Sequence, residues 1–518
     1  MANNEFLTDW GLILMTFLPL AGALVMMLIP KEDEGTHKVV ALLTTLVSAA
    51  FGVAVLADFD YDHADKLQYV VDKSWIEVIS SRFQLGIDGL ALPLVALTLL
   101  ITPLVIIYSW HHFPEPKNPK AFLILILVLQ TGMLGSFVAQ DLILFFVFFE
   151  VVLLPMYFMI GVWGGEDRQY ASIKFFVYTF FGSALMLVSF IALYFVTGAD
   201  TFSMTGLAAG VAERSAAGDI ALSTQVLIFG GMFIGFGIKV PMFPFHTWLP
   251  DAHTQAPTQG SVILAAVLLK LGTYGFIRVA LGILPEAAVE WAPWIGLLAV
   301  IGIIYGALGC LAQTDMKRLI AFSSVAHMGF VMLGISTLTD FGLNAAVFGS
   351  VAHGLITGML FFVAGSVKER YHTLEIKRLG GLLVKAPKMG WILGFVSMAS
   401  LGLPGLAGFW GEIPAILASY NPAPGLPVET FRTYMVIAAI GTVFAAGYLL
   451  WLYQRTAFGT PTEEFADADI PDVQPTEWIA WLPLLVLTLV LGLYPHLLFQ
   501  VMDPAMTALG DVLAAVGS

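Results

Sequence analysis

The sequence has almost no thiol groups and little charge. Cys310 is the single cysteine among 518 residues, and it lies inside an apolar run. One thiol excludes a disulfide framework, a thiolate metal site and an iron–sulfur site within this chain. Charged residues make up only 12% of the sequence, against about 25% in an average soluble domain. This shortage of charge points away from a soluble protein.

The sequence is rich in long apolar stretches. Apolar residues make up 58% of the sequence, and the mean hydropathy is +0.86. Stretches of about 20 apolar residues recur along the chain, which is the length that a membrane-spanning helix needs. The sequence therefore predicts an all-α polytopic membrane protein. Residues 1–10 lack the positive charges of a cleavable signal peptide, and nothing indicates a nucleic-acid partner.

We predict about fourteen spans from these runs. They are expected near residues 10–30, 37–57, 85–109, 121–139, 142–163, 170–197, 222–250, 259–281, 291–312, 316–336, 341–366, 389–420, 431–454 and 477–501. The segment 58–82 is predicted to be a long outer loop, and 456–477 an acidic cytoplasmic loop that only connects two spans.

The distribution of Lys and Arg supports this count. If the first loop is cytoplasmic, fifteen of the 23 Lys and Arg residues, Lys317 among them, fall in cytoplasmic loops and six, including Arg278, fall outside. Positive charge is enriched on the cytoplasmic side of membrane proteins, so both termini are predicted to lie on the outer side. The two cations left over, Lys239 and Lys270, lie within predicted spans.

Lys239 sits in the middle of an apolar run that extends from Leu222 to about Pro250. A lysine in hydrocarbon costs several kcal/mol unless it is paired, hydrated or neutral. Pro241 and Pro244 follow it, and proline removes a backbone donor and breaks a helix. A charge beside a helix break at membrane depth predicts a polar cavity or an ion path.

Two more ionisable residues are predicted to lie deep in the membrane. Glu150 is roughly 12 Å into its span at 1.5 Å per residue, where a carboxylate must pair, hydrate or hold its proton. Lys270 is near the middle of its span, too deep for its side chain to reach either surface. Charged groups at such depth mark ion pathways, although a charge that only holds helices together remains an alternative for Glu150.

His327 and His353 also lie in the middle of their spans. Histidine titrates near physiological pH and relays protons readily. Small residues flank both, which suits close helix packing equally well, so a relay and a structural histidine both stay open. Three further groups are possible accessories, namely His246, His253 and Lys174; the last is either a partner of Glu150 or a cytoplasmic anchor.

Glu412 follows a second interruption. The segment 389–420 is too long for one plain span and contains Pro404 and Gly405. Paired interrupted spans point to an internal inverted repeat with an ion site at each break. We therefore predict two inverted five-helix repeats with broken helices 7 and 12; the regions are 1–120 (three helices), 121–281 (first repeat), 291–454 (second repeat) and 455–518 (acidic loop and last helix).

These groups predict a proton path through the membrane. Its members are Glu150, Lys239, Lys270, His327, His353 and Glu412. The two histidines could ligate haem, but a haem pair does not account for the lysines. The sequence shows no nucleotide-binding loop and no metal cluster, so we predict that this chain binds no cofactor and no metal.

Five stretches resemble the antiporter-like membrane subunits of respiratory complex I, and among them the type-M subunits of bacterial NADH-quinone oxidoreductase (the counterpart of mitochondrial subunit 4). They are residues 148–155, 239–253, the segment around Lys270, 323–329 and 405–412. Types L and N, and sodium/proton antiporter subunits, tend to carry lysine at the position of Glu412. The glutamate therefore favours type M.

The resemblance implies roles for these residues. Glu150 would pair with Lys239 in an input half-channel, Lys270 would be the central connector, and Glu412 would end the output half, with the two histidines along a hydrated axis. This chain would be the non-redox, proton-translocating part of an NADH:quinone oxidoreductase.

The resemblance also implies partners and a location. FMN, iron–sulfur clusters and quinone would reside in other subunits. The partners would be the type-L and type-N subunits, small membrane subunits and the lipid bilayer, in a bacterial plasma (inner) membrane. Two alternatives remain: a subunit of a multi-subunit cation/proton antiporter, and a structural scaffold whose charges only hold helices together.

Overall fold

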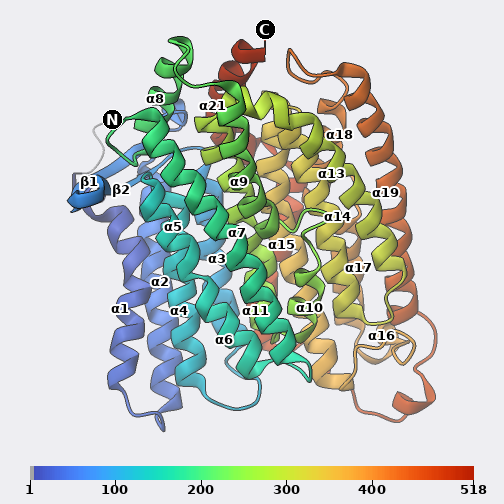
Figure 1. Cartoon of the computed structure of the whole chain (residues 1–518). Coiled ribbons are helices and arrows are strands. Elements are labelled where there is room, and N and C mark those ends of the chain that lie inside the picture. The colour runs from blue at the N-terminus through green and yellow to red at the C-terminus, as the bar shows by residue number, and fades with distance from the viewer. Residues whose placement is uncertain (1–4, 518) are drawn as a thin grey trace.

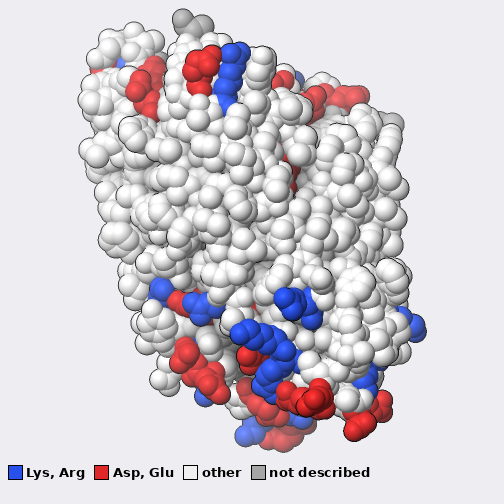
Figure 2. Space-filling model, turned by 90° about the vertical axis from the view of Figure 1, so that its right-hand side faces the viewer, with Lys and Arg blue, Asp and Glu red and all other residues white. Residues whose placement is uncertain are grey.

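The computed structural model describes residues 5–517 as one bundle of long, roughly parallel helices (Figure 1). Figure 2 shows charged side chains gathered at the two ends of the molecule and a nearly uncharged band between them. In the first half the helices are α1 (Leu12–Leu28), α2 (Glu34–Asp58), α3 (Ala91–Tyr108), α4 (Pro119–Val138), α5 (Leu142–Val151), α6 (Leu153–Trp163), α7 (Arg168–Thr197), α8 (Met204–Ala216), α9 (Leu222–Lys239), α10 (Trp248–Gln255), α11 (Thr258–Ile263) and α12 (Leu269–Gly275).

The second half continues the bundle. Its helices are α13 (Pro285–Leu311), α14 (Met316–Ser336), α15 (Asp340–Tyr371), α16 (Leu382–Lys385), α17 (Pro387–Ser400), α18 (Ala407–Ala418), α19 (Val428–Ala457), α20 (Pro475–Leu493) and α21 (His496–Gly517). Within residues 5–517, fourteen helices are long and apolar enough to cross a membrane. This number agrees with the predicted one, but two members differ.

The first difference is the predicted span 389–420, which consists of two half-helices, α17 and α18, each too short to count alone. The second is the last span. It does not end near residue 501, because α21 continues to Gly517. The α20–α21 pair runs antiparallel to α15: Glu477 binds Arg370 near one end of α15, and Asp503 accepts from Asn344 near the other.

One crossing therefore comprises α20 and α21, and another comprises α17 and α18, so the total remains fourteen. An even number of crossings brings both ends of the described chain to the same end of the bundle (Figure 1).

A small antiparallel sheet accompanies the predicted helices. Within the predicted loop 58–82, strand β1 (Gln68–Ile76) pairs with β2 (Ser81–Ile87). We call the end of the bundle that carries this sheet the hairpin end. Buried Asp141 fixes the sheet to the helices: its carboxylate accepts from the Ser81 hydroxyl and the Arg82 amide, each at 2.9 Å. The same carboxylate caps α5 through the amides of Ile143 and Leu144.

Helix breaks lie where the sequence places proline and glycine. Helix α9 ends at Lys239, and α10 begins only at Trp248. The Trp248 indole donates to the carbonyl of Ile238 at 3.0 Å, which holds the two half-helices together. Between α17 and α18, Gly402 and Gly405 adopt φ of +80° and +93°, which glycine tolerates because it lacks a Cβ.

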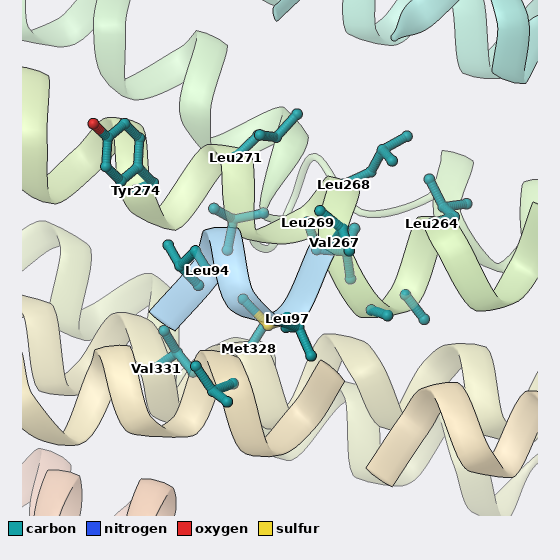
Figure 3. Packing of buried hydrophobic residues seen from close by; sticks show 14 of the residues in the cluster. Leu94, Leu97, Leu264, Val267, Leu268, Leu269, Leu271, Tyr274, Met328 and Val331 are labelled. Atoms are coloured by element: carbon teal, nitrogen blue, oxygen red, sulfur yellow. The ribbon is translucent and has the colours of Figure 1, made fainter. Parts of the chain in front are cut away.

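The core lies along the centre of the bundle. Helices α14 and α15 and the helix around Lys270 are almost wholly buried. Figure 3 shows Leu94 and Leu97 of α3 packed between Leu271 and Val267 on one side and Met328 on the other. Aliphatic packing thus surrounds the polar groups described next.

Candidate functional site

Lys270 lies at the centre of the site and is completely buried. Its helix contains π-helical turns at Leu264–Leu268 and Phe276–Leu281, on either side of α12. The Lys270 Nζ donates to the carbonyl of Ala265, five residues earlier, at 2.6 Å. It also lies 2.7 Å from Nδ1 of His353 on α15. When the ammonium donates to Nδ1, the imidazole proton resides on Nε2.

A small cavity adjoins His353. It is lined by His353, His327 and Glu412, among others, and leaves about 20 Å³ for the centres of water-sized molecules. That space holds about one water. Two buried atoms of the lining residues, Nε2 of His353 and Oε2 of Glu412, have no hydrogen-bond partner among residues 5–517. A polar cavity with two such atoms is suited to a bridging water.

His327 joins four helices on the far side of the cavity. Its Nδ1 lies 2.6 Å from Oε1 of Glu412 on α18. Its Nε2 lies 3.1 Å from the Ser400 hydroxyl on α17 and 3.2 Å from the Tyr448 hydroxyl on α19. The rings of His327 and His353 are 6.1 Å apart. Lys270, both histidines and Glu412 therefore form one network with a gap of about one water.

Lys239 and Glu150 form a second, separate group. Lys239 is 2% exposed at the end of α9, and its Nζ lies 4.6 Å from the ring centre of Phe149. Glu150 and Lys239 interact electrostatically but make no ion pair within 4 Å among the described residues. The α5–α6 helix breaks at Val152, three residues before Pro155, whose ring cannot follow an unbroken helix.

The accessory histidines are buried near the first break. His253 on α10 is fully buried and stacks on Phe361 with ring centres 4.4 Å apart. Neither of its ring nitrogens has a hydrogen-bond partner in the described part of the chain, and it interacts electrostatically with Lys317 and Lys270. His246 is also buried and meets Tyr305 edge-on. His253 is therefore close enough to both lysines to be affected by their charge.

Lys174 is not a partner of Glu150. Its Nζ binds Asp251 on α10 at 2.7 Å, and Arg318 on α14 approaches the same carboxylate at 3.5 Å. Asp251 lies in the first turn of α10, so the partner of Lys174 is carried by the half-helix that follows the break. This ion pair ties α10 to both neighbouring helices.

Two cations that the prediction assigned to loops lie within helices of the structure, one buried and one largely covered. Lys317 is 3% exposed and donates to the carbonyl of Ala256 at 2.5 Å. Arg278 makes two hydrogen bonds of 2.5 Å to buried Asp88 and one of 3.2 Å to Tyr274. The sequence signal for Arg278 was its place inside the predicted span 259–281. Lys317 also lies inside a predicted span, 316–336, but only one residue from its start.

Comparison with known proteins places these features in a family. Residues 139–437 match the family model described as NADH:quinone oxidoreductase/Mrp antiporter, TM. Residues 13–135 match the model of NADH-ubiquinone oxidoreductase chain 4, amino terminus. The NADH-quinone oxidoreductase subunit M of Rhodobacter capsulatus is 41% identical over 96% of both chains. An NAD(P)H-quinone oxidoreductase chain 4 of Synechococcus elongatus is 40% identical over 98% of this chain and 92% of its own.

Solved structures agree with the sequence relatives. A chain of respiratory complex I from Thermus thermophilus with bound NADH superposes with a TM-score of 0.85 at 26% identity, covering 97% of this chain and 99% of that one. A chain of the Mrp complex from a Dietzia species has the same fold, with a TM-score of 0.80 at 20% identity over 98% of this chain and 100% of that one.

The fold and the buried network define an antiporter-like, multi-pass membrane protein. Within that class, the chain belongs to the subunit M (chain 4) family of NADH-quinone oxidoreductases.

Proposed function

We propose that this chain translocates protons as a membrane-arm subunit of a redox-driven NADH-quinone oxidoreductase. One observation carries the proposal: Lys270, His353, His327 and Glu412 form a buried polar network, with one water-sized gap. A scaffold needs no such gap, and a haem site needs no lysine. The proposed complex is redox-driven because the chain belongs to a family of NADH-quinone oxidoreductase subunits.

The proton would move along this network in short steps. Lys270 exchanges a proton with Nδ1 of His353, and the proton on Nε2 then passes through a water in the cavity to Oε2 of Glu412. His327 holds the opposite oxygen of the same carboxylate. Glu412 is the terminal group of the output half, at the break between α17 and α18.

Glu150 and Lys239 form the input group, and His246, His253 and Lys174 are accessories around the same break. A proton that arrives on Lys270 would act on the interaction between Glu150 and Lys239 through the electrostatic field inside the bundle. Redox chemistry elsewhere in the complex would drive the same groups electrostatically.

The two halves would be inverted repeats, 121–281 and 291–454, each with one broken helix, flanked by 1–120 and 455–518. We place the chain in a bacterial plasma membrane with both termini outside. Its partners would be the type-L and type-N subunits and small membrane subunits. FMN, iron–sulfur clusters and quinone would belong to other subunits, so this chain would take part in the reaction without a redox site of its own.

Purification and a pumping assay test the proposal. The tagged chain, purified gently from its own membrane, should bring flavin, iron–sulfur centres and NADH-quinone reductase activity with it. In reconstituted vesicles, Lys270→Met should leave the complex assembled and abolish its share of proton pumping. If Lys270→Met instead reduces the amount of assembled complex, and the complex that does assemble pumps normally, the result would favour a scaffold.

A cation/proton antiporter subunit is the second candidate, favoured by the structural likeness to the Mrp complex. It would co-purify with small membrane proteins and no redox centres. Ion transport driven by a sodium gradient in vesicles would then identify the ion.

A further inference from the structure

Two buried hydroxyl groups meet at one nitrogen of His327. Ser400, the last residue of α17, and Tyr448 on α19 lie 3.1 and 3.2 Å from Nε2 of this ring. Both residues are buried, and Tyr448 is completely so. The other ring nitrogen, Nδ1, faces Oε1 of Glu412. The ring is thus held at both nitrogens, and none of the proposed proton steps passes through either hydroxyl.

The two hydroxyls have no other hydrogen-bond partner among residues 5–517. A buried tyrosine in this bundle can find a main-chain acceptor instead: Tyr434, also on α19, donates to the carbonyl of Pro293 at 3.0 Å. Ser400 and Tyr448 have no such carbonyl within reach. Nε2 of His327 is therefore the one acceptor for both of them in the part of the chain that the structure describes.

This arrangement decides which nitrogen of His327 carries the proton. A neutral imidazole has one donor nitrogen and one acceptor nitrogen. If Nε2 carried the proton, neither hydroxyl hydrogen would have an acceptor, and unsatisfied buried donors are destabilising. If Nε2 is bare, a hydroxyl donates to it, and the proton on Nδ1 points at Glu412. Satisfaction of the hydroxyls therefore selects the tautomer with the proton on Nδ1.

We propose that Tyr448 and Ser400 are positioning residues that keep His327 as a fixed Nδ1–H donor to Glu412. Oε1 of Glu412 then accepts from the ring, so an incoming proton binds Oε2, which accepts no hydrogen bond from the described residues. Glu412 gains and loses its proton on that side alone, while His327 keeps its own. This inference rests on the proposed proton path and adds two residues to it.

Loss of both hydroxyls would open a second exit for the proton. Water that fills the vacated space can accept a hydrogen bond as well as donate one, so both tautomers of His327 would be populated. In the Nε2–H tautomer, Nδ1 can take the proton of Glu412 while Nε2 releases its own proton to that water. Because Nε2 has one lone pair, a single hydroxyl is enough to hold the tautomer. The two hydroxyls should therefore substitute for each other.

Substitutions of the two residues in the assembled complex test this. In reconstituted vesicles, the protons pumped per NADH oxidised are compared with those of Lys270→Met, and the difference defines the share of this chain. Tyr448→Phe and Ser400→Ala should each retain at least about four-fifths of that share. The double variant should retain at most about a fifth, since an equilibrium change of about five-fold is expected when a hydrogen bond is lost.

Two further variants separate positioning from packing. Tyr434→Phe is the matched control, because it removes a buried hydroxyl from the same helix but one that donates to a carbonyl; it should leave the share unchanged. Tyr448→Phe combined with Ser400→Thr keeps one hydroxyl and should recover the share. Where the double variant with alanine does not assemble, Tyr448→Phe with Ser400→Cys replaces it, since a thiol fills the site but donates weakly.

The outcomes distinguish this inference from the proposed function. Full pumping in the double variant, beside reduced pumping in Lys270→Met, would overturn the inference alone. Losses in the two single variants that simply multiply in the double variant would also overturn it, because independent effects on packing combine in that way. Unchanged pumping in Lys270→Met would overturn the proposed function, and this inference with it.

Discussion

Lys270 illustrates how one side chain is stabilised in the membrane. A buried ammonium is costly unless hydrogen bonds satisfy it. Here the carbonyl of Ala265, in the π-helical turn before Lys270, accepts from the ammonium, and His353 supplies a second acceptor. The lysine therefore has two partners, neither of them anionic. A lysine held by neutral acceptors changes its charge more easily than one held by a carboxylate, which suits a proton carrier.

Glu150 gives the first prediction at this scale. Glu150→Gln keeps the shape of the side chain and removes its charge, so the complex should assemble normally. Because the substitution abolishes the electrostatic interaction with Lys239, proton pumping per NADH oxidised should fall, measured by a pH-sensitive dye in vesicles. The matched control is Glu290→Gln, at a carboxylate in the first turns of α13. Unchanged pumping in fully assembled Glu150→Gln complex would remove Glu150 from the path.

The second prediction at the scale of single residues concerns Lys317. Lys317→Met removes the donor to the carbonyl of Ala256, and an unsatisfied buried acceptor costs about 1–3 kcal/mol. Thermal unfolding of the purified complex should begin at a lower temperature. Lys317→Arg can still donate and should retain most of the stability. An equal loss in both variants would show that the fit of the side chain matters and not the hydrogen bond.

At the scale of elements, the interruptions decide where the ionisable groups lie. The α17–α18 break places Gly402 beside Glu412: a Cβ at Gly402 would be 3.2 Å from Oε2 of that carboxylate. The same oxygen accepts no hydrogen bond from the residues that the structure describes. An unbroken helix would turn Glu412 away from both the glycine and the cavity. The break is therefore part of the site.

Gly402→Ala tests the break. The residue has φ of +80°, and a side chain in that conformation costs about 1–3 kcal/mol of strain, in addition to the close contact with Glu412. We expect lower stability and reduced pumping. Gly447→Ala is the control, since nothing lies within 4 Å of an added Cβ at that position in α19, and alanine favours a helix. Similar behaviour of the two variants would contradict the role of the break.

At the scale of the whole molecule, buried ion pairs fasten the peripheral crossings to the core. Arg278 and Asp88 join the helix of Lys270 to the start of α3. Arg370 makes hydrogen bonds of 2.9 and 2.7 Å to Glu477, and both side chains are almost fully buried. These pairs set how the first and last segments pack on the two central halves.

Arg370→Met should be the most damaging single change outside the network. It leaves the Glu477 carboxylate buried and unpaired, which costs about 3–5 kcal/mol. The yield of assembled complex, measured by native gel electrophoresis, should drop sharply. The double variant Arg370→Met, Glu477→Met removes both charges and should recover part of the yield. A double variant as poor as the single one would show that the pair contributes through its other hydrogen bonds to the loop at 471–472.

The sequence alone determined the membrane class, the number of crossings and the identity of the four ionisable residues in the central network. These follow from composition and from the length of apolar runs, which are local properties. Prolines and glycines also located both interruptions, because their backbone limits act within a few residues.

Tertiary structure alone decided which of these residues meet. His327 and Glu412 are 85 residues apart and Lys270 and His353 are 83 apart, and no periodicity encodes such contacts. The β1–β2 sheet, the partner of Lys174, the burial of Lys317 and the joining of α20 with α21 into one crossing were likewise settled by packing between distant helices. A side chain's depth can be read from its neighbours in sequence, whereas its partner depends on how whole helices cross.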